Sequence, residues 1–181
     1  MPTKTDTQFE HATKVCEDVF TKKMKDYGTA WRIMRATSLT DQIMIKARRI
    51  RSLENKKESK INEGVRPEFI GIVNYAAMAL IQLELGYTDE PDMPHDKAAE
   101  LYRSKIKAAQ QLMSNKNHDY DEAWRDMRIS SITDLILMKI NRTKEIEDHD
   151  GNTIISEGID ANYMDMINYA IFAIIRLDFP E

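Results

Sequence analysis

The residues best suited to chemistry occur twice in this 181-residue chain, in the same order and at the same spacing. The first set consists of Ser38, Asp41, Lys46 and Arg49. On a helix, which turns about 100° per residue, these side chains form one polar stripe beside an apolar face. A carboxylate and two cations on one stripe could hold a metal-bound phosphate, and a network of surface ion pairs is the alternative. The second set consists of Ser131, Asp134, Lys139 and Arg142.

Polar residues also interrupt two strongly apolar segments. Glu68, Gly71 and Asn74, spaced by three, run through the first segment. A helix that is apolar all round should be buried, and buried polar groups must find partners. They either bond to neighbouring helices or point into a polar pocket, and Asp165, one turn before Asn168, favours the pocket. The matching residues of the second segment are Asn162, Asp165 and Asn168.

Matched aromatic residues precede each polar stripe. Tyr27 and Trp31 are spaced by four, so they share a helical face. Such residues are most often core anchors, and the functional alternative is a wall on which a nucleotide base stacks. Further on, Glu63 and Gly64 form a loop signal in which the glutamate is a metal ligand or a helix cap. The second copies of these residues are Tyr120, Trp124, Glu157 and Gly158.

An internal duplication explains these matches. Residues 25–54 align with 118–147, and residues 61–83 align with 155–177, with 23 of 53 positions identical. We therefore expect a first helical repeat in residues 1–87, a linker in 88–95 and a second repeat in 96–181, packed as one pseudo-symmetric unit.

The composition and periodicity predict an all-α helical bundle. Only 6 Gly and 5 Pro are present, whereas residues with high helix propensity are plentiful. Pro67 is a favoured early-helix residue, and we expect Gly64 and Gly158 to lie in the loops before the third helix of each repeat. A short helical turn should separate the first two helices. The expected main helices cover residues 8–25, 38–54, 67–85, 96–117, 131–147 and 161–177.

Charge and cysteine usage restrict the function classes. A net charge of −4 and a pI near 5.7 argue against a protein that coats extended nucleic acid, but not against a local basic pocket. The single cysteine, Cys16, suits a reducing compartment. We find no signal peptide, and the apolar stretches 69–83 and 163–177 are too short to span a bilayer. We expect a cytoplasmic protein without a membrane partner.

The combination of motifs resembles a known family. D-Y-G-x-A-W, then S-x-x-D-x-I-x-x-K-x-x-R, then E-G, then a buried N-Y-A helix, is similar to the nucleotide modification associated domain 1 family, once per repeat. That family is in turn similar to the MazG-like all-α nucleoside triphosphate pyrophosphohydrolases. The resemblance implies carboxylates on two helices that hold Mg²⁺, with release of pyrophosphate. It would place the metal near Asp165, Asp134 and Glu157, with Lys139 and Arg142 on the phosphates.

Three hypotheses follow. The first is a Mg²⁺-dependent pyrophosphohydrolase acting on free or modified nucleotides. Since neither repeat has the complete carboxylate set, the second is a non-catalytic nucleotide-binding accessory of nucleotide modification. The third is a helical protein-interaction scaffold, and a further homodimer is compatible with all three. The candidate metal ligands are Asp41, Glu63, Glu68, Asp134, Glu157 and Asp165. The candidate nucleotide or phosphate contacts are Lys46, Arg49, Lys139, Arg142, Asn74, Asn168, Tyr27, Tyr120, Trp31 and Trp124.

Overall fold

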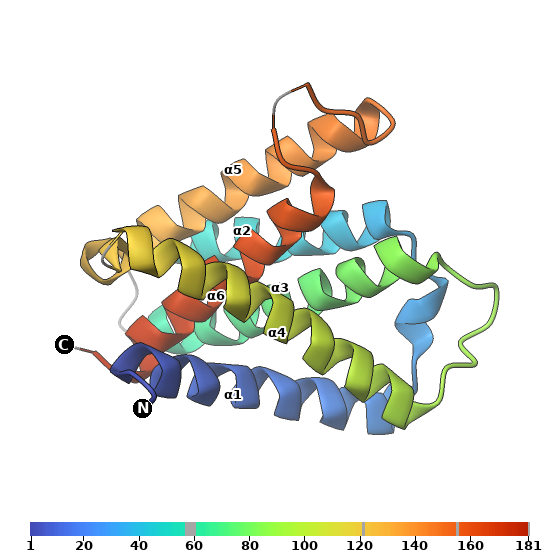
Figure 1. The fold of residues 1–181 in the computed structure, drawn as a ribbon, viewed down its shortest axis with the longest axis horizontal. Coiled ribbons are helices and arrows are strands. Elements are labelled where there is room, and N and C mark those ends of the chain that lie inside the picture. Colours follow the sequence, from blue (N-terminus) through green and yellow to red (C-terminus); the bar gives the residue numbers. More distant parts are fainter. Residues whose placement is uncertain (57–60, 121, 155, 181) are drawn as a thin grey trace.

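The computed structural model describes residues 1–56, 61–120, 122–154 and 156–180, and leaves out the side chains of 61, 62 and 117–120. Within these ranges the chain is entirely helical and contains no strand, which confirms the all-α prediction. Two short 3₁₀-helices accompany the main helices (Figure 1). The elements are α1 (Lys4–Tyr27), η1 (Ala30–Ile33), α2 (Ala36–Lys56), α3 (Ile61–Leu85), α4 (His95–Tyr120), η2 (Ala123–Asp126), α5 (Ile129–Asp148) and α6 (Ile159–Asp178).

The two most apolar helices, α3 and α6, form the centre of the bundle. They pack on each other, and both contact α1 and α4 on one side. On the other side α2 covers α3, α5 covers α6, and α2 and α5 meet (Figure 1). Residues such as Phe69, Ile72 and Ile171 are fully buried there. A helix that is apolar on most of its faces is stable in water only when neighbours cover it on several sides, and this arrangement provides that cover.

Reciprocal contacts show that the repeats are related by a pseudo-twofold axis. The Thr40 hydroxyl donates to Glu147 at 3.0 Å, and Thr133, the counterpart of Thr40, donates to Glu54, the counterpart of Glu147, at 3.1 Å. Burial raises the pKa of both glutamates, and the threonine hydrogen bonds partly oppose that rise. Such exchange of equivalent contacts is typical of an isologous interface, here within one chain.

The start of α3 differs from the prediction. We expected this helix to begin at Pro67 after a loop containing Gly64, but it begins at Ile61 and both residues lie inside it. Proline removes one backbone donor there, which a buried and well-packed helix tolerates. A Cβ on Gly64 would lie only 3.3 Å from Leu53 Cδ1, so this glycine allows α2 and α3 to approach closely. Gly158, by contrast, precedes α6 as its N-cap residue.

Because α3 is longer than expected, its length no longer excludes a membrane span. The segment Glu63–Leu85 is long and apolar enough to cross a bilayer by length and composition, contrary to the estimate made from residues 69–83. However, 67% of its apolar window is buried inside the protein, as in the central helix of a folded bundle.

Asp178, at the end of α6, ties three helices together near the two termini. It accepts two hydrogen bonds from Arg66 of α3, at 2.8 and 3.0 Å, and lies 3.1 Å from His11 of α1. Burial alone would raise the pKa of this carboxyl, but the hydrogen bonds from Arg66 and His11 and the charges of these two groups together outweigh burial and lower it. The charged form of Asp178 is therefore favoured in the folded state.

Replacement Asp178→Asn should lower the free energy of unfolding by about 1–3 kcal/mol at pH 7. Because the folded-state pKa is lowered, this stabilisation is present above the ordinary carboxyl pKa of about 4 and disappears as pH falls through the folded value. Urea unfolding at pH 7 and at pH 3 would measure it, with the exposed Asp89→Asn as control. An equal difference at both pH values would contradict the charge-based account.

Candidate functional site

Each repeat buries one carboxylate on its central helix and pairs it with a lysine of the preceding helix. In the first repeat, Glu68 of α3 is 7% exposed. Its oxygens lie 3.2 Å from Lys46 Nζ and 3.5 Å from Arg49 Nε, both of α2. The polar stripe on α2 therefore faces α3. Of its residues, the two cations, Lys46 and Arg49, pair with Glu68.

In the second repeat the buried carboxylate lies one helical turn later. Asp165 is 3% exposed, and its oxygens lie 2.9 Å from Lys139 Nζ and 2.8 Å from Lys116 Nζ. Burial would lower the pKa of Lys116, but the hydrogen bond to Asp165 and the nearby negative charges, chiefly that of Asp165, together outweigh burial and raise it. The Asp165 carboxylate thus bridges two ammonium groups that come from α5 and α4.

The first repeat has no acid at the position equivalent to Asp165, because Gly71 stands there. A Cβ at Gly71 would lie 3.1 Å from Lys46 Cε, so the missing side chain leaves room for the Lys46 stem. Lys23, the counterpart of Lys116, is exposed and makes no ion pair with any described residue. The first repeat therefore keeps both lysines but lacks the carboxylate that bridges them in the second.

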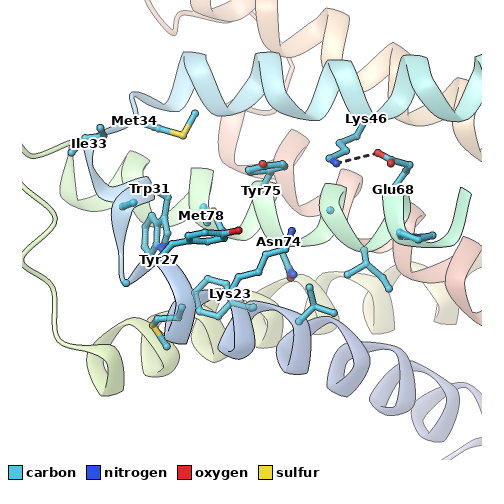
Figure 2. A pocket seen from close by; sticks show the side chains of 18 residues that line it. Lys23, Tyr27, Trp31, Ile33, Met34, Lys46, Glu68, Asn74, Tyr75 and Met78 are labelled. Carbon is cyan, nitrogen blue, oxygen red and sulfur yellow. Dashed lines mark ion pairs between the residues drawn. The ribbon is translucent and has the colours of Figure 1, made fainter. Parts of the chain in front are cut away.

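A cavity of about 590 Å³ opens at this place, between α1, η1, α2 and α3 (Figure 2). Tyr27, Trp31, Tyr75 and Met78 line one part of it. At the other end Figure 2 shows the Lys46–Glu68 ion pair, and Lys23 reaches in from α1. The cavity therefore combines an aromatic wall with ammonium groups.

The tryptophan of each repeat is positioned by one polar side chain of the central helix. The Gln82 amide of α3 donates to the carbonyls of Arg32 and Met34, at 2.8 and 2.6 Å, and so holds η1 in place. Its counterpart Arg176 donates to the carbonyl of Trp124 at 3.3 Å. Because these bonds fix the 3₁₀-helices, both tryptophans are held against the end of the bundle.

The second repeat carries an aromatic ring beside its tryptophan. Phe172 of α6, the counterpart of Met78, stacks on Trp124 with ring centroids 4.3 Å apart and planes inclined by 3°. Trp124 is 6% exposed, whereas Trp31 is only half-buried. Where the first repeat has a thioether and open space, the second has a stacked pair of rings.

The two matched asparagines are structural. Asn74 donates to the carbonyl of Cys16 at 3.1 Å, and Asn168 donates to the carbonyl of Ala109, the residue equivalent to Cys16, at 2.9 Å. Each asparagine thereby fixes the first helix of its repeat to the third. Asn74 also lines the cavity, but its side chain is already bonded, since Tyr102 donates to its Oδ1 at 2.6 Å.

The carboxylates proposed as metal ligands are not brought together. Asp41 pairs with Lys144 at 2.7 Å across the pseudo-twofold interface, and Asp134 pairs with Arg51 at 2.6 Å. Among the described residues no group of three or more His, Cys, Asp or Glu side chains could hold a metal ion. This donor set does not fit a magnesium site. The remaining candidates are separate: Glu63 and Glu157 are exposed, and Glu68 and Asp165 are occupied by cations.

The other candidate nucleotide contacts lie in different surroundings in the two repeats. Tyr27 is 71% exposed at the cavity rim rather than in the core. Arg142 is exposed, and the side chain of Tyr120 lies outside the described residues. Sequence reasoning missed Lys23, Lys116 and the Met78–Phe172 difference. The lysines were detectable from the self-alignment, in which residue 25 matches residue 118. Extending that alignment two positions upstream matches Lys23 with Lys116.

Comparison with known families agrees with this duplicated arrangement. The family described as nucleotide modification associated domain 1 matches residues 23–83 and again residues 116–177. The chain belongs to this family. No curated protein and no solved structure matches it. Both copies of the nucleotide modification associated domain include the paired lysines, and only the first surrounds the described cavity. The similarity to MazG-like enzymes stays a prediction.

The asparagine network yields a stability prediction, because its two halves differ. Asn168 Oδ1 is buried and lacks a described hydrogen-bond partner, since Phe9 stands at the position equivalent to Tyr102. Tyr102→Phe should therefore lower the free energy of unfolding by about 1–2 kcal/mol. Phe9→Tyr should leave it unchanged or raise it by about 1 kcal/mol, because the new hydroxyl would meet the unpaired oxygen.

Urea denaturation of both variants would measure these changes. A double-mutant cycle with Asn168→Ala isolates the new contact, and any benefit of Phe9→Tyr should vanish in that background. If Phe9→Tyr destabilises the protein equally with and without Asn168, the hydroxyl does not reach the amide oxygen.

Proposed function

We propose that this protein binds a nucleotide in the cavity of its first repeat and serves nucleotide modification as a non-catalytic binding accessory. The cavity itself supports the proposal most directly. Its volume of about 590 Å³ lies within the range of roughly 300–1,000 Å³ typical of small-molecule sites. Its lining is mostly apolar and includes a few polar groups, among them Lys23, Lys46 and Glu68.

The aromatic side chains suit the base of a nucleotide. Trp31 and Tyr75 are half-buried and Tyr27 is exposed at the rim, so each has ring surface accessible from the cavity. Every nucleotide base is planar and gains stacking energy from such rings, whichever base it is. Substituents on a modified base can extend toward the opening of the cavity. The apolar Met78 and Ile70 complete this part of the lining.

The lysines suit the phosphate. Lys23 has no ion-pair partner among the described residues, and Lys46 is paired with the buried Glu68. An incoming phosphate would gain charge-assisted hydrogen bonds from both ammonium groups. Because Glu68 stays paired with Lys46 and Arg49, it also holds the Lys46 ammonium in place at the edge of the cavity.

The carboxylate positions favour binding over hydrolysis. A metal-dependent pyrophosphohydrolase needs several carboxylates directed at one point, and the described residues offer Glu68 alone at the cavity. The bound nucleotide would therefore be retained rather than cleaved. A Mg²⁺-dependent hydrolase acting at Asp165 is the competing function, and it predicts pyrophosphate release.

Replacing Lys23 tests the binding site. Lys23→Ala should weaken nucleotide binding about tenfold or more in isothermal titration calorimetry, because a charge-assisted hydrogen bond to phosphate is lost. The control is Lys22→Ala, one residue earlier on α1, whose ammonium pairs with Asp18 at 2.8 Å on the exposed face. Equal affinities of the two variants and the parent protein would show that the phosphate does not lie at Lys23.

Turnover tests the accessory role. We expect no pyrophosphate release from ordinary or base-modified nucleoside triphosphates with Mg²⁺ or Mn²⁺, but a nucleotide-dependent rise in melting temperature. Release that disappears in Asp165→Asn would instead establish the hydrolase. The absence of both release and thermal shift would leave the protein-interaction scaffold.

A further inference from the structure

From the side chains that fill the second repeat, we infer that the first repeat binds a nucleoside monophosphate. This inference rests on the proposed nucleotide site and specifies its ligand. The two repeats share the order and packing of their helices, and both lysines and the tryptophan of the cavity recur in the second copy. Several lining positions of the central helix differ, including Glu68 against Asn162. Two of these differences, Gly71 against Asp165 and Met78 against Phe172, give the second repeat a larger or charged side chain where the first repeat borders the cavity.

Asp165 marks the position of the ligand's anionic half. Its carboxylate accepts from Lys116 at 2.8 Å and Lys139 at 2.9 Å, and it is 3% exposed. The first repeat presents the equivalent lysines, Lys23 and Lys46, around a glycine. A phosphate between these two ammonium groups would take the bridging position that Asp165 has in the second repeat, while Lys46 also stays paired with Glu68.

Phe172 marks the position of the aromatic half. Its ring lies on Trp124 at a centroid distance of 4.3 Å and an angle of 3°, which is the geometry of a base stacked on an indole. In the first repeat Met78 and Trp31 both line the cavity (Figure 2). A base inserted there would take the place that the phenyl ring takes in the second repeat.

The separation of the two halves fits one nucleotide. Asp165 and Phe172 are seven residues apart on α6, so their Cα atoms lie on the same face at a separation of about 10 Å. One pentose between a base and its 5′-phosphate gives a ligand of comparable length. A ring and a single anion at this spacing describe a nucleoside monophosphate.

The charge of the cavity favours one phosphate over three. Among the residues that line the cavity, Lys23 and Lys46 oppose Glu68 alone, which leaves a charge of about +1. A phosphate monoester carries about −1.5 to −2 at neutral pH, which exceeds this positive charge by about one unit at most. A triphosphate would bring further negative charge without additional cations at the described positions around the cavity.

Calorimetric titration with the mono-, di- and triphosphates of each base, with and without Mg²⁺, tests the ligand class. We expect the monophosphate to bind at least as tightly as the triphosphate. A triphosphate that binds about tenfold or more tightly would overturn the inference while supporting the proposed function. Failure of every nucleotide to bind would refute the proposed function itself.

Variants that place second-repeat side chains in the first repeat test whether Asp165 and Phe172 mark the position of the ligand. Gly71→Asp should weaken monophosphate binding about a hundredfold, because the new carboxylate occupies the phosphate position and repels it. Gly71→Asn is the matched control, since it adds the same bulk without charge and should bind more tightly than Gly71→Asp. Both should fold, because the neighbour that must move is the flexible stem of Lys46.

The ring position is tested separately. Met78→Phe should stack on Trp31 and weaken nucleotide binding about tenfold, whereas Met78→Leu, which keeps a similar volume, should not. Inorganic phosphate should still protect Met78→Phe against thermal unfolding, but not Gly71→Asp. Equal nucleotide affinity of Gly71→Asp and Gly71→Asn, or full affinity of Met78→Phe, would show that the second repeat is no guide to the ligand.

Discussion

The structure depends on placing a carboxylate inside its most apolar layer. Glu68 and Asp165 lie on the central helices and are at least nine-tenths buried. An unpaired charge there would cost several kcal/mol, and removing one partner of a buried pair typically costs about 3–5 kcal/mol. The lysine of the preceding helix therefore stabilises the folded protein, together with Arg49 at Glu68 and Lys116 at Asp165. This role explains why Lys46 and Lys139 match between the repeats although their acids stand one turn apart.

The duplication separates what the fold needs from what a site needs. The contacts of Thr40, Asp41 and their counterparts hold α2 against α5, and each contact occurs twice across the pseudo-twofold axis. The asparagine bonds to the first helix are duplicated too. In contrast, the positions of Gly71 and Met78 differ between repeats and lie together at the cavity. Symmetry was kept at the interface and lost at the cavity.

The sequence was sufficient for the helical class, the repeat and the burial of the third helices, because each rests on periodicity or on direct self-alignment. It identified the cations of α2 and the polar residues of α3 as separate candidates, but it did not show that they pair with each other. It could not show that Asp41 turns toward the other repeat, because one stripe on a helix can face two neighbours. The start of α3 was also missed, because Pro67 favours a first turn locally, whereas the helix begins at Ile61 and includes Gly64 at its close approach to α2.

Duplication would be useful for the proposed binding function, because one repeat can stabilise the other. An open cavity lacks packing contacts, which lowers stability while it stays unfilled. In the second repeat Asp165 is bonded to two lysines and Phe172 stacks on Trp124, so the corresponding positions make these contacts within the chain. Because α3 and α6 pack on each other along the centre of the bundle, the filled repeat supports the open one through their shared core. Under the proposed function, the first repeat would remain open for its ligand while the second repeat stabilises the shared core.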